Sequence, residues 1–244
     1  MKSFLKIIVL SFTLVACSKD DQESETSCIE NFYKYPRTVL LTDSFNNNQN
    51  NWNINLEPGF MCNTSLYCEA KIDSGMFLKT GGKNCGGCEA SASWNILLHN
   101  SDFLAAEVKF NDFFISMGYG FAGTDWASSR FVFGFNGLEL SFGHDLRSIS
   151  EFKMNAGGYV IHFLLDLKNQ RTYAFSDKPI PFEELGSSSN IVGKDLRGLT
   201  EIFNSSNSMA LFECKDGFVD LQGPEMSQMS VEYITLYEPI FPCN

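Results

Sequence analysis

Basic residues are scarce in this chain, and no part of it is enriched in them. The 244 residues carry 18 Lys and Arg against 29 Asp and Glu, which gives a formal net charge of −11. Nucleic acids and anionic lipid surfaces are bound through basic patches. We therefore expect no nucleic-acid partner.

The motifs of several catalytic classes are missing as well. The sequence has no Gly-x-Ser-x-Gly elbow, no phosphate-binding glycine loop and no His-Glu-x-x-His pattern. Only three histidines occur, and His162 lies within an apolar run, where we interpret it as a core residue. Catalysis therefore lacks its usual sequence support.

The first 16 residues have the pattern of an export signal. Lys2 and Lys6 precede a short apolar run, and no acidic residue occurs among them. The run is too short to cross a bilayer as a stable helix, so residues 1–16 are expected to be a signal peptide. Its removal takes away two of the 18 basic residues and leaves all 29 acidic ones, so the mature chain is more acidic still.

The residues at the end of this leader indicate a lipid anchor. Leu14–Cys17 (Leu-Val-Ala-Cys) resembles a bacterial lipobox, which implies lipidation of Cys17; an ordinary cleaved signal is the alternative. Residues 18–27 are too polar and acidic to fold, and we expect residues 17–37 to form the tether. The acidic tract resembles the surface-export signal of Bacteroidetes-type lipoproteins, and a merely solvating linker is the alternative. The resemblance implies an outer-membrane protein that faces the cell exterior, with the membrane as partner through the anchor.

From Val39 onward the apolar residues recur with a period of two. Polar and apolar residues alternate over Glu89–Ile96, as in a half-buried strand with one wet face. Asn136-Gly137 predicts a hairpin turn between two such runs, because both residues tolerate positive φ. The run Tyr159–Leu165 is apolar on both faces apart from its histidine, which indicates a central strand.

Residues 38–244 are long enough for one well-buried domain, and roughly ten short strands separated by turn residues favour an all-β fold, a β-sandwich. Phe182–Leu185 and Leu199–Phe203 are the candidates for one or two short helices. Three segments resemble concanavalin-like (laminin G or jelly-roll) domains: Asp43-Ser44-Phe45 with Trp52, Asp166–Phe175, and Val231–Tyr237. The resemblance implies a jelly roll and says little about function.

Eight cysteines occur, and outside the cytoplasm disulfide formation is the default for the seven that follow Cys17. Six of them are expected to pair: Cys28 with Cys243, and Cys62, Cys68, Cys85 and Cys88 among themselves. The local pairs Cys62–Cys68 and Cys85–Cys88 and the crossed pairs between the two loops are equally allowed. A zinc site formed by these four, or a redox-active Cys85-Gly86-Gly87-Cys88, fits the spacing and context less well. Cys214 ends an apolar strand and is expected to be a buried thiol outside any disulfide.

Candidate ligand-binding residues gather in and after a glycine-rich segment, residues 118–130. Aromatic rings stack on the apolar face of a sugar, and charged groups bond its hydroxyls; loops on a rigid sandwich are where such residues concentrate. The candidates are Tyr119, Asp125, Trp126, Arg130, His144 and Asp145. The alternative is that Trp126 caps the core, Asp125 makes a turn and His144-Asp145 is a polar loop.

Glycoside hydrolases of the concanavalin-like fold carry paired acidic catalysts in a Glu-x-Asp-x-x-Glu pattern, whereas Glu139 stands alone in this chain. We therefore predict a surface-anchored lipoprotein whose sandwich binds a ligand, carbohydrate first, without catalysis. One alternative is a glycosidase or polysaccharide lyase that uses Glu139, His144 and Asp145. Another is a structural or adhesion lipoprotein that binds envelope proteins.

No cofactor is predicted, and no metal site is assigned. Asp43, Asn46 and Asn48 carry oxygen atoms of the kind that bind structural calcium near the first strand of such domains, but they form no dedicated calcium loop.

Overall fold

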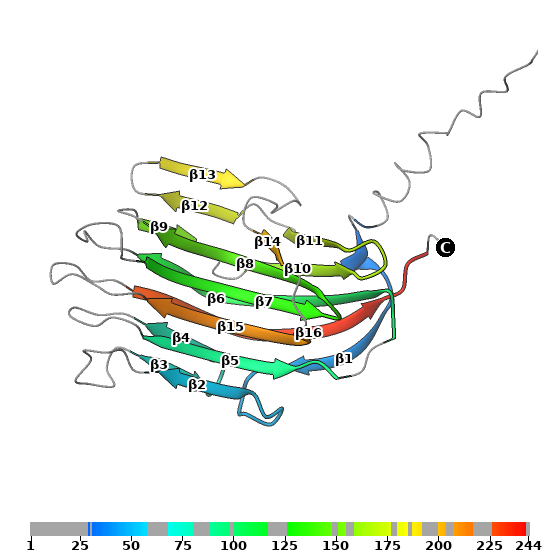
Figure 1. Cartoon of the computed structure of the whole chain (residues 1–244), viewed down its shortest axis with the longest axis horizontal. Helices are drawn as coiled ribbons and strands as arrows, with labels where there is room; N and C mark the ends of the chain where they lie inside the picture. Colours follow the sequence, from blue (N-terminus) through cyan, green and yellow to red (C-terminus); the bar gives the residue numbers. More distant parts are fainter. Residues whose placement is uncertain are drawn as a thin grey trace, which may run out of the picture.

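The strands form two antiparallel sheets that lie over one another (Figure 1). The computed structural model describes residues 29, 31–57, 68–80, 88–97, 100–116, 126–147, 151–154, 159–176, 180–184, 187–191, 200–203, 207–216 and 226–242. Apart from these strands, the described residues include a short 3-10 turn, η1 (Phe32–Lys34). The predicted all-β sandwich is confirmed.

The six-stranded sheet has the order β14-β8-β7-β15-β5-β2. Its strands are β14 (Thr200–Phe203), β8 (Leu138–Arg147), β7 (Trp126–Phe135), β15 (Met209–Asp216), β5 (Glu89–Asn95) and β2 (Asn53–Glu57).

The ten-stranded sheet has the main order β13-β12-β9-β6-β16-β4-β3. In addition, β1 pairs with β16, β10 pairs with β6, and β11 pairs with β10. Its strands are β13 (Ser187–Ile191), β12 (Ile180–Glu184), β9 (Glu151–Met154), β6 (Phe103–Ser116), β16 (Met226–Pro239), β4 (Met76–Thr80), β3 (Glu69–Ile72), β1 (Arg37–Asp43), β10 (Tyr159–Asp166) and β11 (Arg171–Ser176).

Two long strands, β6 and β16, form the centre of the ten-stranded sheet and pair along most of their length. On the other side of β6, β9 pairs with one end and β10 with the other. On the other side of β16, β4 pairs with one end and β1 with the other. The register between β6 and β16 shifts on both sides of Val231, where these outer partners change. Because such irregularities bend a strand and increase its twist, the sheet changes direction at this point.

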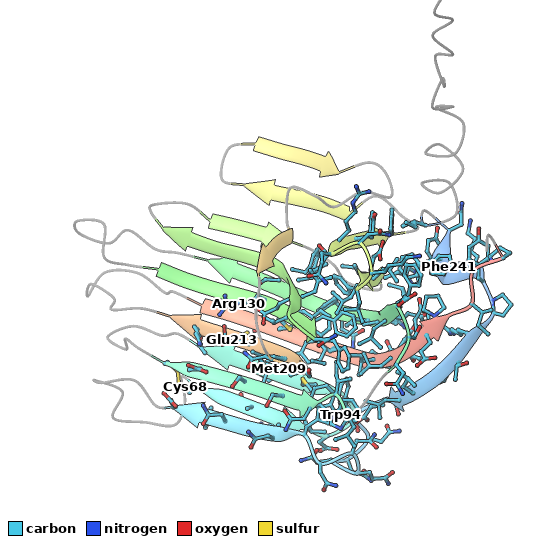
Figure 2. The ribbon with its side chains drawn as sticks, turned by 45° about the vertical axis from the view of Figure 1, so that its right-hand side comes forward. Cys68, Trp94, Arg130, Met209, Glu213 and Phe241 are labelled. Carbon is cyan, nitrogen blue, oxygen red and sulfur yellow. A yellow bond between two sulfur atoms is a disulfide. The ribbon has the colours of Figure 1, made fainter. Side chains whose placement is uncertain are left out.

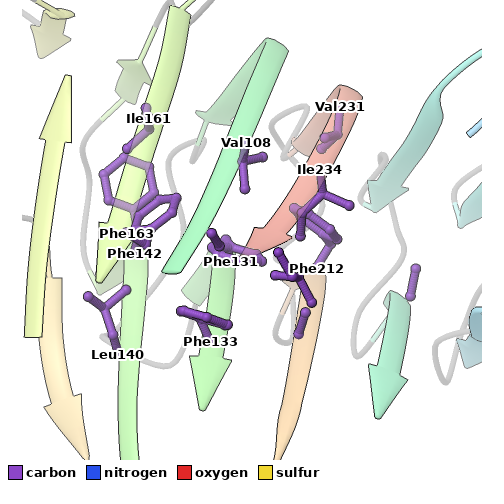
Figure 3. Packing of buried hydrophobic residues seen from close by; sticks show 14 of the residues in the cluster. Val108, Phe131, Phe133, Leu140, Phe142, Ile161, Phe163, Phe212, Val231 and Ile234 are labelled. Carbon is purple, nitrogen blue, oxygen red and sulfur yellow. The ribbon is translucent and has the colours of Figure 1, made fainter. Parts of the chain in front are cut away.

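The core between the sheets is built around phenylalanine. The ring of Phe131 lies 4.7 Å from that of Phe212 and 5.0 Å from that of Phe163, centroid to centroid (Figure 3). Phe142 lies on β8, next to the strand of Phe131, and also packs on Phe163 of the ten-stranded sheet. Complete burial of such a ring stabilises the fold by roughly 2–3 kcal/mol. Eight of the 23 phenylalanines in the sequence are buried in this interlayer core.

The predicted hairpin is confirmed, and the segment Asp166–Phe175 forms a second one. Asn136 and Gly137, with φ of 48° and 89°, connect β7 to β8, and Phe135 pairs directly with Leu138. The turn after Asp166 connects β10 to β11, and β10 pairs on its other side with β6. The prediction of a central strand over Tyr159–Leu165 is therefore right as well.

The two predicted helices are wrong. Phe182–Leu185 overlaps β12, which pairs with β9 and β13, and Leu199–Phe203 overlaps β14, which pairs with β8. Short apolar runs do not distinguish a strand from a helical turn by periodicity alone. Here the deciding factor is the free hydrogen-bonding edge that each sheet offers.

The Asp43 carboxylate organises the loop after β1, and this explains the first segment of the family resemblance. It is 6% exposed and accepts hydrogen bonds from the Phe45 amide (2.7 Å), the Asn50 side chain (2.8 Å) and the Trp52 indole (2.8 Å). The Asn48 side chain accepts a hydrogen bond from the Trp52 amide and donates one to the Trp52 carbonyl oxygen. These groups satisfy one another, and the described residues include no group of three or more His, Cys, Asp or Glu side chains that could hold a metal ion.

Cys68 and Cys88 form a disulfide that joins the starts of β3 and β5, with their Cα atoms 6.2 Å apart. This is one of the crossed pairings between the two loops, so the local pairs Cys62–Cys68 and Cys85–Cys88 are wrong. The thiol of Cys214 is buried and outside any disulfide, as predicted. Cys17, Cys28, Cys62, Cys85 and Cys243 lie outside the described residues.

The outward side of the ten-stranded sheet, called here the covered face, carries a second apolar cluster. Phe32, Ala105, Leu164, Phe175 and Tyr237 are buried there, with Phe241 packed against them. The segment before β1 and the segment after β16 therefore both lie on this sheet (Figures 1 and 2). Among the described residues, no helix has the length and apolar character needed to traverse a lipid bilayer.

Candidate functional site

The outward side of the six-stranded sheet, called here the polar face, carries ion pairs and neutral polar side chains, whereas the covered face carries an apolar cluster. Strand register defines which residues share it, because paired residues of neighbouring strands lie on the same side and successive residues alternate. Three rows of paired residues run across the sheet from β2 to β8. They are Glu57-Glu89-Lys215-Ser128-Asp145, Asn55-Ser91-Glu213-Arg130-Gly143, and Asn53-Ser93-Leu211-Val132-Ser141.

A chain of four alternating charges crosses three strands of this face. The Arg130 Nε atom lies 2.6 Å from a Glu213 carboxylate oxygen, and the Lys215 Nζ atom lies 2.7 Å from the other (Figure 2). Lys215 also contacts Glu89 at 3.2 Å. The Glu213 side chain is 4% exposed, whereas those of Arg130 and Lys215 are 29% and 25% exposed. A nearly buried carboxylate that is bonded by two cations fixes both of them in place.

The ammonium of Lys215 is held in its charged form. Burial acts against that charge, but the hydrogen bonds and negative charges of Glu213 and Glu89 outweigh it and raise the pKa of Lys215 above its usual value. The group is therefore a permanent cation at physiological pH. It does not have the lowered pKa of a lysine that acts as a base or nucleophile.

The accessible part of the polar face runs from β15 to β2. Val132 and Ser141, towards β8, are almost inaccessible, as is Ser91 on β5, whereas other residues towards β2 are partly or fully exposed. We call these residues the polar strip; they are Asn53, Asn55, Ser93 and Asn95, beside Leu211 and Met209. Amide and hydroxyl groups both donate and accept hydrogen bonds. The strip thus presents uncharged groups that can both donate and accept hydrogen bonds, next to the small apolar surface of Leu211 and Met209.

Of the predicted site residues, the structure brings three strand positions to this face. Arg130 is fully described, and the positions of Trp126 and Asp145 share its side of the sheet, since Trp126 pairs with Arg147 and Asp145 with Ser128. His144 pairs with Ser129, so its position belongs to the opposite, inward side. Tyr119 and Asp125 lie outside the described residues.

Glu139, named in the enzymatic alternative, lies on β8 opposite Gly134. A Cβ atom at residue 134 would lie 3.3 Å from the Glu139 side chain and 3.0 Å from the Asn207 carbonyl oxygen, so glycine leaves the room that this side chain occupies. Glu139 and Asp145 are six residues apart on one strand, or roughly 20 Å at the rise of an extended chain. Paired glycosidase carboxylates lie at most about 9.5 Å apart.

A second group of titratable residues lies on the covered face and not in the interlayer core. Glu107 accepts hydrogen bonds from Arg37 (2.6 Å) and from the Tyr233 hydroxyl (3.0 Å). His162 lies beside them, stacked on the Tyr33 ring at 4.3 Å, with Nδ1 3.8 Å from the Glu107 carboxylate. The histidine is buried, as expected of a core residue, but η1 covers it and the second sheet does not. This group joins the terminal segment to the sheet.

Burial opposes ionisation of Glu107, but the hydrogen bond and charge of Arg37, with the Tyr233 hydrogen bond, lower the pKa of its carboxyl group below the usual value. Burial and the nearby Glu107 carboxylate raise the pKa of Tyr233 to about 12. The pair is therefore stable as a carboxylate and a neutral phenol. Both pKa values are shifted away from neutral pH, where an acid or base catalyst works best, so this arrangement is structural.

Sequence reasoning missed Glu213, Lys215 and the asparagines of β2. A signal for β15 existed, because Met209–Lys215 alternates between buried residues and the polar-face residues Leu211, Glu213 and Lys215. This alternation does not reveal the order of the strands in the sheet. The pairing of β15 with both β5 and β7 is what brings Glu213 and Lys215 beside Glu89 and Arg130.

No protein-family model and no curated protein matches this sequence. Among solved structures, the endo-1,3-beta-glucanase from Streptomyces sioyaensis has 8% identity and a TM-score of 0.36, with 82% of this chain and 96% of that chain covered. The glycoside hydrolase family 16 endo-glucanase from Bacteroides ovatus has 9% identity and a TM-score of 0.33, with 81% and 100% covered. The lectin from Bauhinia forficata has 8% identity and a TM-score of 0.34, with 77% and 99% covered. Enzymes and lectins both occur among these jelly-roll proteins, and at such identities neither activity is carried to this chain.

Proposed function

We propose that this protein is a surface-anchored lipoprotein that binds carbohydrate, without catalysis, on the polar face of its six-stranded sheet. The observation that carries the proposal is the polar strip beside the Arg130–Glu213–Lys215 ion pairs. Rigid strands place these groups, and sites built on strands hold their geometry more closely than sites on loops.

The chemistry of the strip suits sugar hydroxyls. Each hydroxyl donates one hydrogen bond and accepts others, which matches the amides and hydroxyls of Asn53, Asn55 and Ser93. Leu211 and Met209 offer apolar contact to the C–H side of a sugar ring. The face thus combines apolar surface with a few fixed polar groups.

The spacing of the carboxylates supports the non-catalytic version. The positions of Glu139 and Asp145 are too far apart for a catalytic pair, and Glu213 is bonded by two cations. A general acid must instead keep its proton until the leaving group needs it. We expect the purified domain to release no reducing ends from any polysaccharide that it binds.

Affinity electrophoresis of the domain, without its leader and tether, through gels that contain single polysaccharides tests the binding proposal. We expect retardation by at least one of them and its loss in Trp126→Ala. Tyr33→Ala, which removes an aromatic ring from the covered face, is the matched control and keeps the retardation. Carbohydrate binding is overturned if no polysaccharide retards the domain, and unchanged migration of Trp126→Ala shows that the ligand does not extend to that position.

Anchoring is tested separately on the full chain in a bacterial host with lipoprotein processing. Detergent-phase partitioning should place the wild type with the lipid and the Cys17→Ser variant in the aqueous phase. Protease treatment of intact cells should then remove the anchored protein if it faces the exterior. Partitioning that is the same for both chains would contradict a lipid anchor at Cys17.

A further inference from the structure

The charges on the polar face limit the class of ligand that it can bind. Among the described side chains of this face, the cations are Arg130 and Lys215, and both are engaged by carboxylates of the same face. An anionic sugar would need to draw one of them away from Glu213. That would leave a nearly buried carboxylate short of its partner, which is costly.

The other charged side chains that the structure describes on this face are negative. Glu57 and Glu139 have no cationic partner among the described side chains, and there the Glu57 carboxylate accepts a hydrogen bond from the Asn55 side chain, at 3.3 Å. The described part of the face therefore carries an excess of carboxylates, in a chain whose formal net charge is −11. Sulfated or uronic polymers are repelled by such a field at low salt.

A cationic ligand is disfavoured by geometry. Glu57 is on β2 and Glu139 is on β8, which are four strands apart in the sheet. At a strand spacing of about 4.8 Å they lie roughly 19 Å apart across the sheet, and their different rows separate them further along the strands. The two uncompensated carboxylates therefore do not converge on one amino group, and the ion-paired Glu89 and Glu213 already share Lys215.

We infer that the ligand is a neutral glycan, without sulfate, uronate or free amino groups, and that it lies along the polar strip. This inference rests on the proposed carbohydrate-binding function and specifies the ligand class of the same face. The ion pairs then act as a frame that positions neighbouring side chains, while the neutral amides and hydroxyls make the contacts. Binding of this kind depends little on salt, because no ion pair forms with the ligand.

Matched pairs of polysaccharides test the ligand class. We would measure affinity electrophoresis and calorimetry with dextran against dextran sulfate, with hydroxyethyl cellulose against carboxymethyl cellulose, and with neutral mannan, galactan, xylan and laminarin, at 50 and 500 mM NaCl. The expected result is binding of at least one neutral polymer, with an affinity that changes less than about twofold between the two salt concentrations.

Variants locate the contacts. Asn53→Ala and Asn95→Ala should each weaken binding of the retained neutral polymer about fivefold, the effect of one net hydrogen bond. Asn111→Ala, an exposed asparagine on the ten-stranded sheet, is the matched control and should not change it. Thermal melting of each variant shows whether it is folded. If both strip variants are folded and bind like the wild type, the placement along the strip is overturned.

The two proposals fail differently. If the sulfated or carboxymethylated polymers bind more tightly than their neutral counterparts, with strong salt dependence, carbohydrate binding stands and the neutral class is overturned. If neither the neutral nor the anionic polymers bind at either salt concentration, the carbohydrate-binding function is overturned together with the inference that rests on it.

Discussion

The outward sides of the two sheets use their side chains in opposite ways. On the covered face, η1 and the segment after β16 bury an apolar cluster, and the Arg37–Glu107–Tyr233 group lies beside it. The polar face carries ion pairs and neutral polar side chains instead, and the residues of the polar strip are accessible to solvent.

This difference separates stability from binding. The segments before β1 and after β16 cover the outward side of the ten-stranded sheet, so substitutions there should change folding stability. The other side keeps polar groups in fixed positions without such a cover among the described residues, so changes there should act on ligand binding. Each prediction below asks whether a change on one face leaves the other unaffected.

Phe32→Ala should have the largest effect on stability. The ring is fully buried against Phe175 and His162, and its removal should destabilise the fold by about 3–5 kcal/mol. Urea unfolding measures the change, and the affinity for a bound glycan should stay the same. A loss below about 1 kcal/mol would show that η1 is not held on the sheet by this ring.

Glu213→Ala should have the next largest effect, and it should act on both properties. Two cations lose a nearly buried partner, which should cost about 2 kcal/mol, reduced by their partial exposure to water. Neutral-glycan binding should weaken because the frame is lost, while weak salt-sensitive binding of dextran sulfate should appear.

Glu232→Ala is the matched control, because it breaks the more exposed pair with Lys109 on the covered face. An exposed pair of this kind contributes about 0–1 kcal/mol. If Glu213→Ala is as mild as this control in urea unfolding and leaves both glycan affinities unchanged, the ion pairs do not organise the polar face.

Glu107 should make the wild type sensitive to acid. Since the folded pKa of this carboxyl group lies below the usual value of 4.5, its contribution to stability is complete above that pH. It is lost as the pH falls through the lower, folded pKa. The unfolding free energy of the wild type should therefore fall more between pH 5 and pH 2.5 than that of Glu107→Gln, in urea titrations at each pH. Parallel curves for the two proteins would contradict this account.

Tyr233 should produce the smallest effect, at alkaline pH. Because its pKa is raised to about 12 in the folded protein, its contribution is complete below the usual value of 10.0 and is lost as the pH rises towards 12. Tyr233→Phe should remove part of this alkaline loss. Another part remains, because burial and the nearby Glu107 carboxylate also raise the pKa of Tyr237. Unfolding at pH 9 and pH 11 measures the difference between the variant and the wild type.

Local chemistry was sufficient to predict much of the fold. Asn136-Gly137 predicted its hairpin through positive φ, and the apolar run around His162 predicted a central strand. The sequence instead predicts helices at the short strands β12 and β14, since their residues do not contain the neighbouring strands that pair with them. The Cys68–Cys88 pairing was open for a similar reason, because sequence spacing allows both local and crossed pairs.

The candidate site was less predictable than the fold. Arg130 was named from its neighbours in the sequence, but its partner Glu213 is 83 residues away and meets it only through the pairing of β7 with β15. His144 was grouped with Asp145, and alternation along β8 then places the two positions on opposite sides of the sheet. Which residues share a face depends on strand order, which a single sequence does not contain.

The central claim is that the polar face binds the glycan and the covered face does not. A large side chain placed at matched strand positions tests it directly: Ser93→Arg on the polar face and Thr42→Arg on the covered face, where Thr42 lies opposite Thr235. Calorimetry with the neutral polysaccharide that best retards the wild type should show a loss of about tenfold or more for Ser93→Arg, through steric exclusion, and no change for Thr42→Arg. Wild-type affinity in a folded Ser93→Arg protein, with loss of binding in Thr42→Arg, would contradict the claim.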